Sequence, residues 1–170
     1  MRKIDMMAYP DNTKIISILA SISIVLGFLE NLFPLPIPFI RLGISNIPIV
    51  IGVYLIKELR FLLLLGGIKS LITAIFSTGF IFRLIIAFPS ILVAILFMFY
   101  YHKATKNYSS AISTSVIGSV VNITMQFIII KLVIIKHLAF LKILPYFILA
   151  AILTGAIVGL ISNNILNKRG

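Results

Sequence analysis

The stretch Phe61-Leu-Leu-Leu-Leu-Gly-Gly-Ile-Lys-Ser-Leu-Ile-Thr-Ala-Ile-Phe76 decides the class of protein, because it is apolar and long enough to cross a bilayer as a helix. Lys69 falls near its middle. A cation in hydrocarbon costs from about 3 kcal/mol on insertion scales to much more in simulations, so it usually faces a cavity or a polar partner. The stretch therefore predicts a membrane protein that handles a polar or anionic ligand.

The composition of the whole chain agrees with this class. Of 170 residues, 61% are hydrophobic and 11% are charged, and the mean hydropathy is +1.18. A soluble domain keeps roughly a quarter of its residues charged, so membrane lipid must be the main surrounding of this chain. The chain has no cysteine, and its two histidines lie far in sequence from the acidic residues. Neither a metal site nor a cofactor is expected.

The apolar runs are continuous and lack polar alternation at period two, which predicts helices and not strands. We expect an all-α membrane protein, a six-helix transmembrane bundle, with spans over residues 14–33, 46–56, 61–79, 82–101, 110–135 and 143–166. The second run is short, so it is expected to be tilted, broken or extended. Asn46 followed by Pro48 is typical of a helix start, where the Asn side chain caps free N–H groups.

Domain organisation and orientation follow from these spans and from the cations. Residues 1–13 and 168–170 are expected as short cytoplasmic segments that flank one six-span domain over residues 14–167. The net charge of +11 comes from cations spread over loops and span ends, which favours anchoring and contact with anionic lipid over binding of nucleic acid. The side that holds both termini carries nine cations and the other side five, which predicts a multi-pass protein of the bacterial cell membrane with both termini in the cytoplasm.

Six polar residues at or near membrane depth are the candidate ligand-binding set: Glu30, Arg41, Asn46, Lys69, Asn122 and Gln126. Asn122 and Gln126 share a helix face, where they could bond to neighbouring helices or line a polar pocket. Glu30 could neutralise Arg41 or Lys69. Two cations against one carboxylate leave a positive excess that would suit a phosphate or carboxylate.

Small residues recur at four-residue spacing, which lets helix backbones approach closely in lipid. They are Ser17, Ser21, Ser23 and Gly27 in the first span, Ser115 and Ser119 in the fifth, and Gly155 and Gly159 in the sixth. This pattern fits packing inside the bundle, and it also fits a docking face for another membrane protein. The first span's set is the candidate docking face.

Two segments, Leu29-Glu-Asn-Leu-Phe-Pro-Leu-Pro-Ile-Pro38 and Ile40-Arg-Leu-Gly-Ile-Ser-Asn46, resemble a known family. It carries the labels heptaprenyl diphosphate synthase component I and Gx transporter, and it is similar to the substrate-binding S-components of energy-coupling factor (ECF) transporters. The family has a basic residue in its third span, matched here by Lys69, and an amide element in its fifth. Arg41 stands where the family usually has Lys, Lys69 where it often has Arg, and Val121 where it often has His.

The resemblance implies a function without catalysis by this chain alone. It implies an S-component-like subunit that captures a small anionic molecule for uptake and docks, through its first span, a transmembrane coupling subunit driven by ATPases. The alternative is a non-catalytic accessory subunit of polyprenyl diphosphate synthesis or of a flavin or quinone redox system. Prenyl elongation needs magnesium held by clustered aspartates, whereas this chain has only four acidic residues and no two share a motif.

Overall fold

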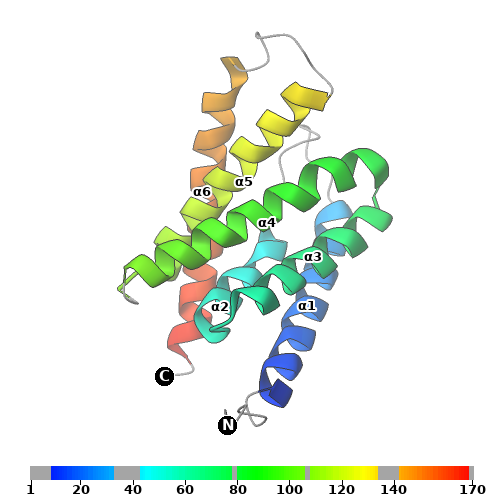
Figure 1. Cartoon of the computed structure of the whole chain (residues 1–170). Coiled ribbons are helices and arrows are strands. Elements are labelled where there is room, and N and C mark those ends of the chain that lie inside the picture. Colours follow the sequence, from blue (N-terminus) through cyan, green and yellow to red (C-terminus); the bar gives the residue numbers. More distant parts are fainter. Residues whose placement is uncertain (1–8, 33–42, 78–79, 106–107, 134–141, 169–170) are drawn as a thin grey trace, which may run out of the picture.

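The computed structural model describes residues 9–32, 43–77, 80–105, 108–133 and 142–168 of the chain (Figure 1). The described residues form six α-helices and one 3₁₀ turn, which confirms the all-helical prediction. These elements are α1 (Tyr9–Leu32), η1 (Ile44–Asn46), α2 (Ile47–Leu55), α3 (Leu59–Ile75), α4 (Phe80–Ala104), α5 (Ala111–Val133) and α6 (Leu144–Asn167). Arg41 and the proline-rich segment 34–38 lie outside the described residues.

The six described helices differ in length. Four helices are long and apolar enough to cross a membrane, namely α1, α4, α5 and α6. Helix α3 has 17 residues and rises about 26 Å, a little less than a typical hydrocarbon core. Helix α2 has only 9 residues, so it rises about 14 Å and reaches roughly halfway. The predicted second span is therefore a half-length helix and not a tilted crossing.

Successive helices run in alternating directions, so the start of α1 and the end of α6 lie at the same end of the bundle (Figure 1). We call this the terminal end. The turn between α2 and α3 and the end of α4 lie towards this end too. Lys57, Arg60, Lys103 and Lys168 belong to these segments, as the cation pattern predicts.

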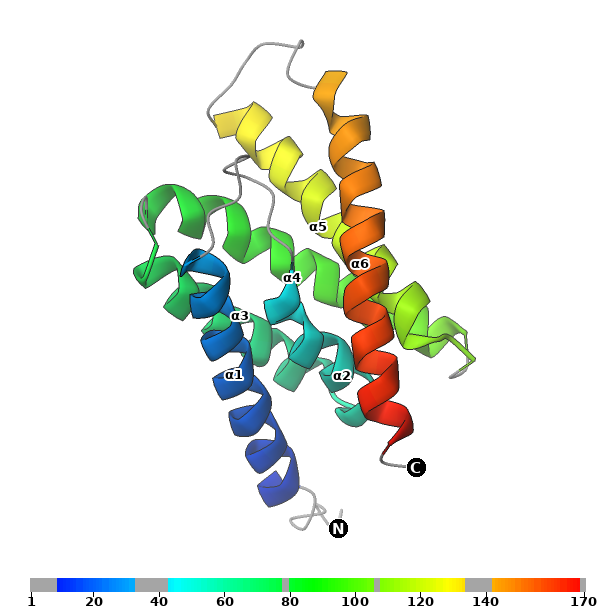
Figure 2. The ribbon, with the colours of Figure 1, turned by 180° about the vertical axis from the view of Figure 1, so that it is seen from behind.

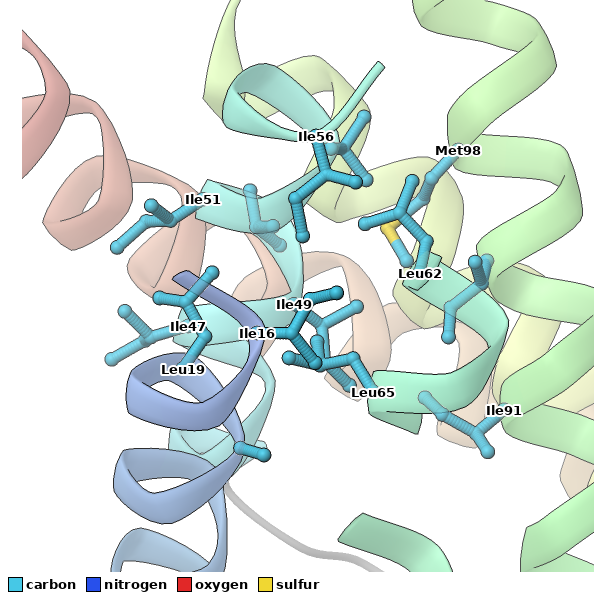
Figure 3. Close-up of a cluster of buried hydrophobic side chains, with 14 of the residues drawn as sticks. Ile16, Leu19, Ile47, Ile49, Ile51, Ile56, Leu62, Leu65, Ile91 and Met98 are labelled. Atoms are coloured by element: carbon cyan, nitrogen blue, oxygen red, sulfur yellow. The ribbon is translucent and has the colours of Figure 1, made fainter. Parts of the chain in front are cut away.

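Helix α2 occupies the middle of the bundle. Each of the other five helices packs against it, and the second view shows it between α1 and α6 (Figure 2). All seven residues from Ile47 to Val53 are buried. Leu62 and Leu65 of α3, and Ile91 and Met98 of α4, belong to the apolar cluster around it (Figure 3). A half-length helix is stable here because protein, not lipid, surrounds its backbone.

Glycines set the close approach of α5 and α6. A Cβ on Gly159 would lie 2.5 Å from the Ile112 Cα, and one on Gly155 would lie 2.8 Å from the Ser119 Oγ. The small residues of the fifth and sixth spans therefore pack against each other inside the bundle, which is one of the two roles that their spacing predicts.

The glycines of α3 and α6 offer a matched test of this packing. Gly159→Ala should destabilise the fold by about 1–3 kcal/mol, because the new methyl group would meet the α5 backbone, which cannot rotate away. Gly67→Ala is the control, since its Cβ would meet only Phe88 at 3.7 Å and the helix gains an alanine. Thermal unfolding of both variants in the same detergent measures the difference. Equal stability of the two variants would contradict the packing described.

Candidate functional site

The site lies where the chain enters α2. Gly43 adopts a left-handed conformation with φ 72°, which side chains rarely tolerate, and its carbonyl accepts a hydrogen bond from the Asn46 N–H at 2.8 Å. This turn produces η1, the short element that places Ser45 and Asn46 between α1 and α3. Two adjacent residues thereby face two different helices.

Lys69 points into the bundle. Its side chain is buried, with 7% exposed, and the Nζ donates a hydrogen bond to the Asn46 Oδ1. An ammonium group at this depth needs such acceptors, because hydrocarbon offers none. The predicted capping role of Asn46 is wrong: Asn46 does stand at the N-cap of α2, but its side chain makes no capping bond, since the oxygen is engaged by Lys69.

Glu30, near the end of α1, holds the neighbouring residue. The Ser45 Oγ donates to the Glu30 Oε2 at 2.7 Å, and the Ser45 N–H donates to the Oε1 at 3.3 Å. A carboxylate that accepts two hydrogen bonds from one residue fixes both its side chain and its backbone. Ser45 itself is 4% exposed, so water competes little for these bonds.

Glu30, Ser45, Asn46 and Lys69 together form what we call the η1 clamp. A carboxylate from α1 and an ammonium from α3 hold consecutive residues of one turn. Thr73 lies one turn after Lys69 on α3. Its Oγ1 donates to the Lys69 carbonyl at 2.8 Å, and its methyl group fills the space beside Gly27. Ser45 and Thr73 were not among the six residues of the predicted ligand-binding set. Their signals were adjacency to Asn46 and the four-residue spacing from Lys69.

Asn122 and Gln126 lie on α5, both half-buried. The Asn122 Oδ1 is buried and has no hydrogen-bond partner among the described residues. Helices α2 and α5 run in opposite directions, and the Tyr54 hydroxyl of α2 contacts the Thr114 hydroxyl of α5 at 2.9 Å. Asn46 and Asn122 each lie eight residues, about 12 Å, from that contact, so they reach a similar depth in the bundle.

The candidate docking residues of α1 divide between two faces. Ser17 and Ser21 are exposed, and their hydroxyls donate to carbonyls of their own helix. Ser23 is fully buried, and Gly27 lies against Thr73 of α3. The outward face of α1 thus offers only the first pair, set among exposed apolar side chains such as Ile18 and Ile22.

These features define a class: a helical membrane protein with a buried, charged clamp at the start of a half-length central helix. A sequence model of the heptaprenyl diphosphate synthase component I family matches residues 19–165, and the chain belongs to this family. Searches of curated proteins and of solved structures gave no significant match. The family predicted from the sequence is therefore confirmed, and the similarity to S-components stays a prediction.

The contact between Lys69 and Asn46 can be tested through stability. Asn46→Ala removes an acceptor from a buried ammonium and should destabilise the fold by about 1–3 kcal/mol. In the double variant Asn46→Ala/Lys69→Met the charge is gone, so the loss caused by Asn46→Ala should be smaller. Unfolding of the four proteins in one detergent gives the coupling. Fully additive losses would show that the two side chains do not interact.

Proposed function

We propose that this chain is a non-catalytic membrane subunit of polyprenyl diphosphate synthesis, which holds an anionic ligand at the η1 clamp. Membership of a family named for one component of a synthase supports the role as a subunit of polyprenyl diphosphate synthesis. The acidic residues support it as well, because only Asp5, Asp11, Glu30 and Glu58 are present, and elongation requires clustered carboxylates for magnesium. A catalytic partner would supply the chemistry.

The buried ammonium of Lys69 is the observation that supports binding of an anionic ligand. A cation that is 7% exposed in a chain of this composition costs free energy, and a protein retains such a group mainly for function. Lys69 is a compact point charge that suits phosphate oxygens. The half-buried amides Asn122 and Gln126, at a similar depth, would accept or donate the remaining bonds of the ligand.

A prenyl diphosphate would match both the buried cation of the η1 clamp and the apolar surroundings of this chain. Its diphosphate would exchange with Asn46 at the Lys69 ammonium, and its apolar chain would lie among the apolar side chains or in the surrounding lipid. A subunit of this kind would keep a growing apolar product in the membrane while a partner extends it. No bond of the ligand changes on this chain.

Uptake of a small anion is the second candidate function. The exposed Ser17 and Ser21 favour it, because small residues on an outward helix face permit close docking of another membrane helix. The partner would be a transmembrane coupling subunit with ATPases, since this chain has no glycine-rich phosphate loop of its own. Replacing Ser17 and Ser21 together by leucine should abolish co-purification with such a subunit.

An elongation assay separates the two functions. The chain alone in vesicles should form no prenyl product. Added to the soluble catalytic component from the same organism, it should raise the yield or the chain length several-fold, and Lys69→Met should remove most of that gain. Lys142→Met, an exposed lysine outside the clamp, is the control. Unchanged yield and product length on adding the chain would exclude the accessory role.

Ligand binding has its own measurement. Farnesyl diphosphate at about 100 times its Kd should stabilise the protein by about 2.7 kcal/mol, which corresponds to a rise in Tm of about 5–10 °C for a chain of this size. Farnesol, which has the same chain without the diphosphate, is the matched control. Equal shifts with both compounds, or no loss of the shift in Lys69→Met, would contradict the proposed site.

A further inference from the structure

A second polar cluster lies at the opposite end of α2. The Tyr54 hydroxyl donates to the Ser109 carbonyl at 3.0 Å and contacts the Thr114 Oγ1 at 2.9 Å. Because the single phenol proton goes to the carbonyl, which cannot donate, Thr114 donates to the phenol oxygen. The His102 Nδ1 lies 2.8 Å from the Ser109 Oγ, and its ring lies 4.3 Å from that of Tyr54. We call these four residues the Tyr54 knot.

The knot joins three elements in a partly buried setting. Tyr54 comes from α2, His102 from the last turn of α4, and Thr114 from the first turn of α5. Thr114 is fully buried, and Ser109 is 9% exposed. Hydrogen bonds are directional, and the loss of one leaves a polar group unpaired where water reaches it poorly. The knot therefore fixes where α2 ends relative to α4 and α5.

Between the η1 clamp and the knot, α2 makes only apolar contacts through side chains. Every residue from Ile47 to Val53 is buried, and each is aliphatic, glycine or proline. Apolar burial is favourable but not directional, so it selects the axial position of a short helix less sharply than hydrogen bonds do. Polar bonds at the two ends are what specify one position for α2. Asn46, just before α2, and Tyr54, eight residues later, provide such bonds at the two ends.

We infer that Tyr54 is a positioning residue for the η1 clamp: the knot sets the axial position of α2, and that position seats Asn46 against Lys69. This rests on the proposed function only in taking the clamp as the ligand site. The linkage works in both directions, because coupling between two sites is reciprocal. An anion that takes Lys69 from Asn46 leaves the start of α2 held through Ser45 and Glu30. This loosens α2 and weakens the knot at the terminal end, where a soluble partner would sense it.

Acetylation of Lys69 by acetic anhydride, followed by mass spectrometry, tests the linkage without any ligand. The full-length protein in detergent micelles is used, and exposed Lys14 serves as the reference for reagent activity. Tyr54→Phe should raise the acetylation rate of Lys69 about tenfold, the factor expected from losing the two partly buried hydrogen bonds of the phenol. Asn46→Ala, which removes the acceptor directly, should raise it at least as much. Tyr100→Phe, an exposed tyrosine in the last turns of α4, should leave it unchanged.

Three outcomes would overturn the inference. Faster acetylation in Asn46→Ala but not in Tyr54→Phe would show that the knot does not position Asn46. An unchanged rate in both variants would show that Asn46 does not shield Lys69. An equal rise in Tyr100→Phe would assign the effect to general loosening. Should Tyr54→Phe fail to fold, Thr114→Val removes one bond of the same knot at nearly equal volume, and the same tenfold rise is expected.

The assay is independent of the function proposed for the chain. A tenfold rise in Tyr54→Phe together with no stabilisation by farnesyl diphosphate would keep the linkage and reject the ligand. Stabilisation by farnesyl diphosphate with no change in Lys69 acetylation in Tyr54→Phe would keep the ligand and reject the linkage.

Discussion

The rest of the structure depends on the need to satisfy one ammonium group inside an apolar bundle. Lys69 can be accommodated there only if acceptors reach it, and the Asn46 side chain is one. To bring Asn46 to that position, the chain turns at Gly43, forms η1 and starts α2 in the middle of the bundle, not at its edge. The half-length helix that starts at this turn contacts all five of the other helices.

Much of the fold could be predicted from the sequence, because long apolar runs allow few structures in lipid. All six helices were expected, and their alternating directions follow from short connections. The role of the second run could not be predicted: hydropathy records how apolar Ile47–Leu55 is, but not whether protein or lipid surrounds it. Burial by five helices is a long-range property that no local pattern contains.

The candidate site was predictable in part, for a similar reason. A lysine in an apolar run is conspicuous by its cost, so Lys69 stands out without any structure. Its partnership with Asn46 joins residues 23 positions apart, whereas local rules predict a capping role for Asn46. The only signal for Ser45 is its place beside Asn46, and Tyr54 has none, since a serine in a turn and a tyrosine at a helix end are common.

The central claim is that Lys69 faces the protein interior and not the acyl chains. The chain has no cysteine, so single cysteines can be placed along α3, spin-labelled and measured for collision with oxygen, which concentrates in lipid. We predict low oxygen accessibility at positions 69, 70 and 73, which are buried, and high accessibility at positions 64, 71 and 75, which are exposed. Accessibility at position 69 as high as at position 71 would contradict the account.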